Sequence, residues 1–339
     1  MIQGFVGRME LHINGSKLCL VLISRRAAKR GGTQSFATGL DGGGNAANYV
    51  ETEQILTTKD HYFSFVQCRG SAPVLWNEEK SSYGTSSVRF WGSLPENYSS
   101  FCDHLRVIHS GGDYDNIFLV NLLASAKEEK KLVENYEYLV RMLVAEEEDS
   151  RSKIGCDVNY AYFDIHGECT ASDYSKLNQF IGDELNGPIR HCGFTALKIH
   201  RQERRIEAVQ QQQGVVRVNC YTCVDRSNIF QARAASLKLL EILNYLDIEV
   251  GELGAGLAFF NKSTPFANMY RSLWADNADA LSKQYTGTGS IESFAVRKGK
   301  LSYMTTLDHG MKSIARVIRN LRNQDHHKQL AIQTIIGEE

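Results

Sequence analysis

Proline is scarce in this chain, with 4 residues among 339, so no proline-rich linker divides the sequence. Charge of one sign is also missing, because 38 lysine and arginine residues meet 39 aspartate and glutamate residues, a formal net charge of −1. A protein that wraps nucleic acid usually carries a clear basic excess, so we expect no nucleic-acid partner. The apolar share of 42% and the charged share of 23% are those of a globular protein and exclude a disordered or collagen-like chain.

Long hydrophobic runs are absent as well. The longest apolar stretches, residues 18–23 and 117–124, fall far short of the roughly 20 residues that a membrane-spanning helix needs. No charged segment followed by an apolar one opens the sequence, so we expect no secretory leader. The 8 cysteines are too few for a disulfide scaffold in a chain of this length. They predict free thiols in a reducing, cytoplasmic setting.

Hydrophobic periodicity predicts strands that alternate with helices, which indicates an α/β fold with a central mixed sheet flanked by helices. Residues 1–75 are predicted to be mainly β, with a hairpin around Asn14 and Gly15. The α/β core is expected over residues 101–322, and the polar segment 77–100 is predicted to be a loop. The remaining predicted strands are 49–56, 62–67, 117–123, 159–165 and 214–219. The predicted helices are 128–148, 173–185 with Ser172 as N-cap, 228–246, 266–285 and 305–321.

One segment combines residues typical of phosphoryl transfer. Residues 217–228 contain Cys220, then five residues, then Arg226, between a predicted strand and a predicted helix. Loop N–H groups and the helix N-terminus can cradle phosphate oxygens there, and with Arg226 they should lower the pKa of Cys220. The resulting thiolate can attack phosphorus, and the planar fork of Arg226 suits phosphate. Asp225 can protonate the leaving oxygen, and Ser227 can hydrogen-bond the thiolate.

The cysteines of this segment allow other interpretations. Cys220 and Cys223 have the Cys-x-x-Cys spacing of metal or redox pairs. Zinc would need a second pair, and the nearby His191 and Cys192 fit no common site. We predict neither a metal nor another cofactor, because Arg226 and the loop amides can supply the charge stabilisation that a metal would give. Cys223 either traps an oxidised Cys220 as a disulfide or packs beneath the loop.

Residues 217–228 resemble the loop of the Sac-domain phosphoinositide phosphatases, Arg-x-Asn-Cys-x-Asp-Cys-Leu-Asp-Arg-Thr-Asn. Other segments resemble further motifs of the family, and all of them lie in the family's order along nearly the whole chain. They are residues 24–26 with 30–33, 45–54, 65–73, 274–279 and 283–289. The resemblance implies one Sac catalytic domain over residues 1–339, without the family's N-terminal subdomain or a membrane anchor. It also implies a phosphoinositide headgroup as substrate and a phosphocysteine intermediate on Cys220.

The resemblance places the substrate against the loop. The residues it implies as contacts are Asn219, Tyr221, Thr222, Cys223, Val224, Ser227 and Asn228. Thr222 stands where the family has aspartate, which leaves open a catalytically impaired phosphoinositide-binding protein. A protein-tyrosine phosphatase is a further alternative, although its loop usually begins His-Cys and contains glycine, and neither feature is found here.

Residues outside the loop are candidates for support. Asp164 and His166 either line the site or form a buried pair that organises the core. Asp276 and Asp279 are candidates for acid–base chemistry or for support of the loop. The alternative is that they form a solvated or capping pair on a helix. Lys283 belongs to the last family motif and is a candidate supporting residue.

Two groups of basic residues could meet an anionic lipid. Arg25, Arg26 and Arg30 either reach an inositol phosphate or remain in a solvated loop. The predicted C-terminal helix carries a basic face opposite an apolar one; its basic residues are Lys312, Arg316, Arg319 and Arg322. That face either lies in water or binds anionic membrane reversibly. We expect peripheral contact with the cytosolic face of endomembranes, and the sequence predicts no particular protein partner.

Overall fold

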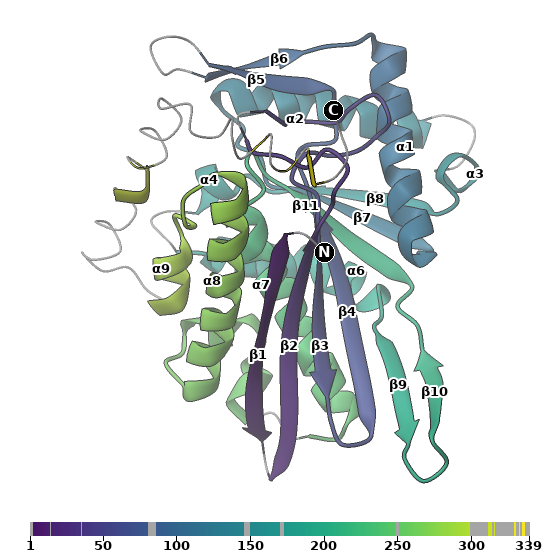
Figure 1. The fold of residues 1–339 in the computed structure, drawn as a ribbon, viewed down its shortest axis with the longest axis vertical. Coiled ribbons are helices and arrows are strands. Elements are labelled where there is room, and N and C mark those ends of the chain that lie inside the picture. Colours follow the sequence, from purple (N-terminus) through teal and green to yellow (C-terminus); the bar gives the residue numbers. More distant parts are fainter. Residues whose placement is uncertain are drawn as a thin grey trace.

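The structure is a computed structural model. It describes residues 3–13, 15–34, 36–80, 86–145, 150–169, 173–248 and 251–298, together with 311–313, 315, 329, 332, 334 and 335. In these parts of the chain a mixed sheet has nine strands, in the order β1-β2-β3-β4-β11-β7-β8, with β9 beside β4 and β10 beside β9 (Figure 1). The strands are β1 (Gly4–Ile13), β2 (Ser16–Arg26), β3 (Val50–Thr57), β4 (His61–Arg69), β7 (Asn116–Asn121), β8 (Asp157–Tyr162), β9 (Thr195–His200), β10 (Arg205–Gln210) and β11 (Gly214–Asn219).

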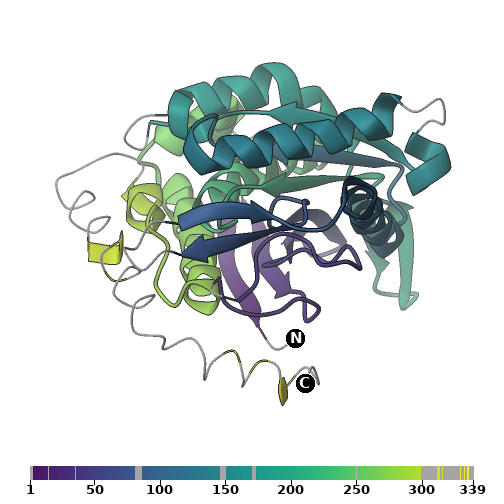
Figure 2. The same cartoon turned by 90° about the horizontal axis from the view of Figure 1, so that it is seen from above.

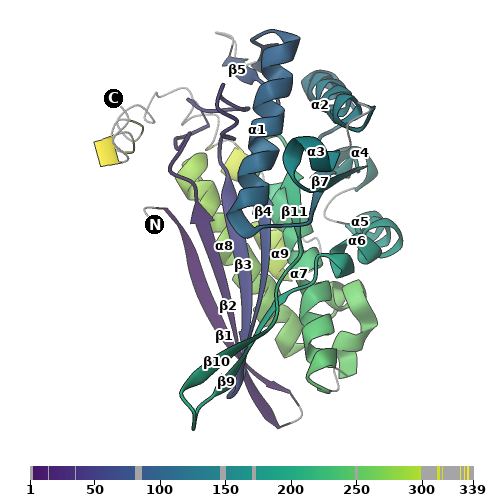
Figure 3. The same ribbon diagram turned by 90° about the vertical axis from the view of Figure 1, so that its right-hand side faces the viewer.

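Helices flank this sheet (Figures 2 and 3). Alternate residues of β11 enter separate hydrophobic clusters, since Val216 and Val218 join one cluster and Val215 the other. The first cluster includes residues of α7 and α8, and the second includes residues of α1 and α2. The described helices are α1 (Leu94–Gly112), α2 (Lys127–Ala145), α3 (Ser150–Ile154), α4 (Ile165–Glu168), α5 (Ser175–Phe180), α6 (Asn186–His191), α7 (Asp225–Tyr245), α8 (Pro265–Tyr285) and α9 (Ser293–Lys298), with a π-helical turn at Ile181–Leu185 and a 3₁₀ segment at Gly251–Asn261.

The direction of four strands decides where a site can form. Strands β4, β11, β7 and β8 are parallel, so their carboxyl ends meet at one edge of the sheet. The register pairs Val218 with Arg69, and Asn219 with Asn121. The segments that follow these strands therefore converge, although they are far apart in the sequence. Such an edge is the usual ligand site of open α/β sheets.

The predicted α/β class with a central mixed sheet is confirmed. The hairpin at residues 12–23 is also confirmed as part of the longer β1–β2 pair. The predicted loop over 77–100 is wrong, because it contains most of the hairpin β5 (Trp76–Lys80) and β6 (Ser86–Phe90) and the start of α1. Ser93 caps α1 in a capping box with Glu96, a local pattern that the serine-rich composition concealed.

Two predicted helices differ from the structure in other ways. The helix over 173–185 is interrupted, because α5 ends at Phe180 and a π-helical turn leads into α6. The expected N-cap, Ser172, lies outside the described residues, and the structure has Tyr174 before the first turn. The helix over 305–321 lies outside the described residues except for 311–313 and 315, which are helical. Strands β9 and β10 were not predicted.

Candidate active site

The segment between β11 and α7 forms a short, tightly held loop. All six residues of β11 are buried, and α7 begins at Asp225. Cys223 has a φ of 53°, in the left-handed region, which reverses the chain direction just before the helix. The side-chain amide of Asn48 donates to the carbonyls of Thr222 at 3.0 Å and Cys223 at 3.4 Å. Residues far away in the sequence therefore fix the loop conformation.

Cys220 lies at the start of this loop and is only 1% exposed. Its Sγ accepts the backbone N–H of Cys223 at 3.1 Å and the hydroxyl of Ser227 at 3.3 Å. Burial alone would raise the pKa of the thiol. A hydrogen bond from the Cys223 side chain, the charge of Arg226 and the hydroxyl and amide of Ser227 outweigh burial and lower the pKa of Cys220 to about 6. The geometry thus favours a thiolate at neutral pH.

The Cys223 thiol lies against the backbone of Cys220, whose N–H it accepts at 3.3 Å. It donates to the carbonyls of Gly70 at 2.7 Å and Cys220 at 2.9 Å, and it is 1% exposed. Burial raises its pKa, and so does the neighbouring Cys220. The two thiols therefore differ in character, with the anionic form favoured on Cys220. The packing of Cys223 beneath the loop matches one of the two interpretations from the sequence.

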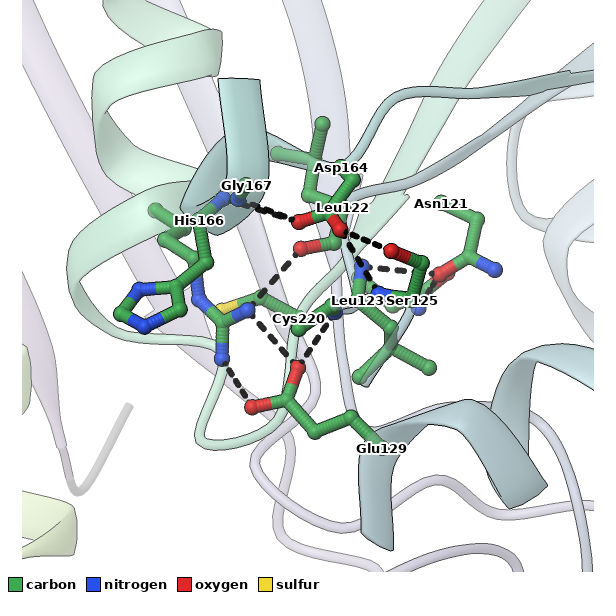
Figure 4. A network of polar contacts seen from close by, with 12 residues as sticks. Asn121, Leu122, Leu123, Ser125, Glu129, Asp164, His166, Gly167 and Cys220 are labelled. Carbon is green, nitrogen blue, oxygen red and sulfur yellow. Dashed lines mark hydrogen bonds and ion pairs between the residues drawn. The ribbon is translucent and has the colours of Figure 1, made fainter. Parts of the chain in front are cut away.

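The guanidinium of Arg226 is held by a glutamate that the sequence did not single out. Both terminal nitrogens of Arg226 donate to the Glu129 carboxylate, each at 2.8 Å, and Nη1 also donates to the carbonyl of Leu122 at 3.1 Å (Figure 4). Both side chains of the ion pair are 21% exposed. Glu129 also accepts the backbone N–H of Ala124 at 2.7 Å. The pair stands at the edge where β7 ends, because Leu122 directly follows that strand, and Figure 4 shows Glu129 and Cys220 in the same network.

Asp225 is anchored on a segment from beyond α8. Its Oδ1 accepts the hydroxyl of Ser290 and the backbone N–H of Ile291, the latter at 2.9 Å. The backbone N–H of Ser290 donates in turn to Asp279 at 2.9 Å. The carboxylate of Asp225 is therefore fixed at the first turn of α7, and Asp279 supports its anchor from α8.

The two aspartates of α8 share a cation. Arg297 of α9 donates to Asp276 at 2.7 Å and to Asp279 at 2.9 Å. This arrangement favours a supporting role for both aspartates over acid–base chemistry. Lys283 is exposed in the last turn of α8.

Asp164 organises the turn after β8 and does not pair with the ring of His166. It accepts the backbone N–H groups of His166 at 3.1 Å, Gly167 at 2.7 Å and Ser125 at 2.8 Å. Burial would raise its pKa, but these bonds, together with the hydroxyl of Ser125, lower it. His166 is exposed, so the buried Asp–His pair considered from the sequence is wrong. Asp164 and Ser125 instead line a cavity of about 600 Å³. Ser125 belongs to the segment after β7, in which the Leu122 carbonyl accepts Arg226.

The other loop residues predicted to contact substrate have varied surroundings. Tyr221 packs against Trp76, with ring centroids 5.3 Å apart, and its hydroxyl donates to Glu78 at 3.2 Å. The Asn219 amide is buried and donates to Asn121 at 2.8 Å. Val224 and Asn228 are also buried, whereas Thr222 is half-buried. The buried side chains of this group thus hold the loop in place, and it is the loop backbone that could present N–H groups to a ligand.

The three N-terminal arginines contact neighbouring strands and loops. Arg25 forms ion pairs with two glutamates of β3, and Arg30 donates to the carbonyl of Thr38 at 2.7 Å. Arg26 is buried, donates to the carbonyl of Gly32 and lies over the ring of Tyr285, 5.4 Å from its centroid. These side chains fix neighbouring backbone and strands, while the side chain of Arg25 remains 42% exposed.

Most of the predicted basic face at the C-terminus, Arg316, Arg319 and Arg322, lies outside the described residues. The exception, Lys312, donates to the Ser290 carbonyl and the Ser293 hydroxyl, each at 2.8 Å. In the described part of the chain, no helix is long and apolar enough to cross a membrane. The same residues contain no group of three or more His, Cys, Asp and Glu side chains that could hold a metal ion.

Comparison with known proteins assigns a class to this arrangement. The sequence profile of the SacI homology domain matches residues 1–170, half of the chain. The chain belongs to this family.

Individual relatives extend the similarity over nearly the whole sequence. Phosphatidylinositol-3-phosphatase SAC1 of Saccharomyces cerevisiae is 31% identical over 327 residues, which cover 94% of this chain and 49% of that protein. The SAC1 phosphatase of Drosophila melanogaster is 31% identical over 341 residues, covering 100% of this chain and 53% of the relative. Polyphosphatidylinositol phosphatase INP53 of S. cerevisiae is 29% identical over 341 residues, which cover 99% of this chain and 28% of that protein. The chain thus spans about half the length, or less, of these relatives.

Proposed function

We propose that this chain is a phosphoinositide phosphatase that hydrolyses phosphate monoesters of phosphatidylinositol phosphates through a phosphocysteine on Cys220. The observation that carries the proposal is the position of the Cys220 thiol before α7, where its Sγ accepts the Cys223 N–H and the Ser227 hydroxyl and its pKa is lowered to about 6. Family membership and the names of the relatives support the substrate class. The substrate is a lipid, so we also propose that the protein works at the cytosolic surface of endomembranes.

In the proposed first step, the Cys220 thiolate attacks phosphorus and the bond from phosphorus to the inositol oxygen breaks. Asp225 donates a proton to the leaving oxygen. Loop N–H groups and Arg226 stabilise the charge on the phosphoryl oxygens. The bonds to Glu129 and Leu122 use three of the five N–H donors of Arg226, which leaves Nε and the second N–H of Nη2 to bind a phosphoryl oxygen while Glu129 holds the guanidinium in place.

In the proposed second step, water attacks phosphorus and the sulfur–phosphorus bond breaks. The departing thiolate is stabilised by the hydrogen bonds from Cys223 and Ser227 that already exist in the resting site. Asp225 takes a proton from the attacking water, and phosphate then leaves. Each group returns to its starting state.

A comparison of substrates tests the proposal. The whole chain should release phosphate from a short-chain phosphatidylinositol monophosphate and leave a phosphotyrosine peptide untouched. The alternative with a specific observation behind it is a phosphoinositide-binding protein without turnover, because Thr222 replaces the family's aspartate. Binding of the headgroup without phosphate release would favour that alternative, and a large gain of activity in Thr222→Asp would point the same way. Hydrolysis of the peptide alone would indicate a protein-tyrosine phosphatase.

Asp225→Asn tests the proposed acid. Turnover of a phosphoinositide should fall by about 10²–10⁴-fold, since the inositol oxygen needs a proton to leave. Turnover of p-nitrophenyl phosphate should fall much less, because its leaving group is stable as an anion. Asp279→Ala is the matched control, since it removes the support of Ser290 and keeps the Asp225 carboxylate. Equal losses on both substrates in Asp225→Asn would make Asp225 a structural residue.

The contact between Cys220 and Cys223 predicts reversible oxidation. Peroxide should convert the Cys220 thiolate to a sulfenic acid with release of hydroxide, and the Cys223 thiol should then displace water to form a disulfide. Mass spectrometry after mild peroxide treatment should detect this bond, and dithiothreitol should reverse it. In Cys223→Ser, the same treatment should oxidise Cys220 irreversibly. Irreversible oxidation of Cys220 in the unmodified chain, with Cys223 still reduced, would contradict the prediction.

A further inference from the structure

Arg69 is a buried cation beneath the loop, and the mechanism proposed above does not use it. It is the last residue of β4, paired with Val218 of β11 in the register of the sheet, and its side chain is 0% exposed. Its Nη1 reaches the Val224 carbonyl and the Asn228 side-chain oxygen, both at 3.4 Å. Its Nε and Nη2 are buried and have no hydrogen-bond partner among the described residues. A guanidinium has five N–H donors, so this one is poorly satisfied.

A buried cation needs a counter-charge nearby, because its hydration is lost. Three groups interact electrostatically with Arg69, namely Cys220, Cys223 and Asp225. Burial lowers the pKa of Arg69 to about 10, which still leaves it protonated at neutral pH. Of the two cysteines, Cys220 favours the anionic form. Arg69 pairs with Val218, two residues before Cys220, and the next residue, Gly70, accepts the Cys223 thiol at 2.7 Å, so the unsatisfied cation and the proposed nucleophile lie close together under the same loop.

A buried polar network fixes the partner of Arg69 in place. The Asn228 oxygen that faces Arg69 also accepts the amide of Asn277 at 2.9 Å. Asn277 accepts the hydroxyl of Ser24 at 2.7 Å, and Ser24 contacts the hydroxyl of Thr52 at 2.9 Å. Every member is buried. The network connects the first turn of α7 with α8 and with strands β2 and β3.

The members of this network come from separate motifs of the sequence. Ser24 lies in residues 24–26, Thr52 in 45–54 and Arg69 in 65–73, while Asn228 and Asn277 lie in 217–228 and 274–279. Five motifs thus meet at one set of hydrogen bonds. A buried, connected network restricts its members to one arrangement. The position of Arg69 relative to the loop is therefore defined by four other elements.

We propose that Arg69 is a positioning residue of the catalytic loop, where its buried guanidinium holds the first turn of α7 and balances the charge of the Cys220 thiolate. The inference rests on the proposed function of the loop. It assigns to Arg69 a role distinct from that of Arg226, which stands at the edge of the sheet with Glu129. Arg69 acts on the nucleophile from below and does not contact substrate.

A pH titration of the Cys220 thiolate tests this role without any measurement of activity. The ultraviolet absorbance of the thiolate is followed in the whole chain, with Cys220→Ser in the same background as the blank. The other charged and polar groups that face the two cysteines are Arg69, Arg217, Arg226, Ser227 and Tyr285, and Asp225 faces Arg69. Arg69→Met should raise the midpoint of Cys220 by about 1–3 pH units, because a nearby opposite charge shifts a pKa by that amount.

Arg233→Met is the matched control. Arg233 is a second buried arginine whose pKa burial also lowers to about 10, but it binds Asn178 and lies over the rings of Tyr174 and Phe260. Its replacement should lower the melting temperature and leave the Cys220 midpoint unchanged. Arg69→Lys keeps the charge, so its midpoint should stay near that of the unmodified chain. Turnover should nevertheless fall, because an ammonium is more strongly hydrated than a guanidinium and is therefore held less well in a buried position beneath the loop.

The possible results separate this inference from the proposed function. A folded Arg69→Met chain with an unchanged Cys220 midpoint would overturn the role of Arg69, and so would an equal shift in Arg233→Met. If Arg69→Met does not fold, Arg69→Gln keeps a donor toward the loop without the charge and should show the same raised midpoint. An unchanged midpoint in Arg69→Gln would then overturn the role. The unmodified chain could also hydrolyse no phosphoinositide while Arg69→Met still raises the Cys220 midpoint. That result would refute the proposed function and leave the Arg69–Cys220 coupling intact.

Discussion

Cys220→Ser is expected to lower phosphoinositide turnover by about 10⁴-fold or more, the scale of losing a nucleophile from a catalytic unit. A serine hydroxyl is almost entirely protonated near neutral pH, and it is a far weaker nucleophile than a thiolate. The hydrogen bonds from Cys223 and Ser227 favour the thiolate, but they cannot make a comparable alkoxide. Headgroup binding should remain largely intact, because the loop backbone is unchanged. Phosphate release and headgroup binding by calorimetry measure the two effects.

Cys192→Ser is the control for this variant. Cys192 is also fully buried, but burial raises its pKa to about 12, and it lies outside the loop. Its replacement should leave turnover within about twofold once the folded fraction is taken into account. Substantial residual activity in Cys220→Ser would refute the phosphocysteine mechanism.

Arg226→Lys should lower turnover by about 10²–10³-fold, the range found when a single charge-stabilising donor is lost. Lysine keeps the charge but offers a point charge where arginine offers a planar fork. The same fork now binds Glu129 through two bonds of 2.8 Å, so the variant also loosens this pair. We expect kcat to fall more than KM rises, because the charge on the phosphoryl oxygens is greatest in the transition state.

Two further variants interpret the Arg226 result. Arg201→Lys changes an exposed arginine of the β9–β10 connection and should have no effect on turnover. Glu129→Gln keeps the shape of the side chain and removes a negative charge beside the proposed phosphate site, so it should reduce repulsion of the headgroup and lower KM for the phosphoinositide. A rate near that of the unmodified chain in Arg226→Lys would remove Arg226 from its proposed role.

The sequence was sufficient to predict the elements around the loop. Strand β11 was predicted at its observed bounds, because Val215, Val216 and Val218 concentrate β-branched residues in a short segment. Helix α7 begins three residues earlier than predicted, since Asp225 and Arg226 did not read as part of an amphipathic pattern. Short-range patterns therefore located the strand and the helix that flank Cys220.

The partners of the loop could not be predicted in the same way. Glu129 stands in a run of charged residues at the start of α2. The exposed face of any surface helix has the same charged pattern, so the sequence does not distinguish Glu129 from its neighbours. Its contact with Arg226 spans 97 positions and exists only because β7 and β11 are neighbours. Arg69 and Asn277 belonged to recognised motifs, but their burial, and hence their roles, depend on the packing of α7 and α8 over the sheet.

The position of β11 has a consequence for the order in which the chain can fold. This strand lies between β4 and β7, yet it follows β4 by more than 140 residues in the sequence. During synthesis, β4 and β7 emerge first, and neither can pair with the other while the place between them is vacant. Closing such a long loop is entropically costly and slow. The region that matches the SacI homology domain profile, residues 1–170, ends before β11, so that region alone cannot complete the centre of the sheet. The last central strand to be made is thus β11, which leads directly into Cys220. The loop can therefore form only when the rest of the sheet has been synthesised.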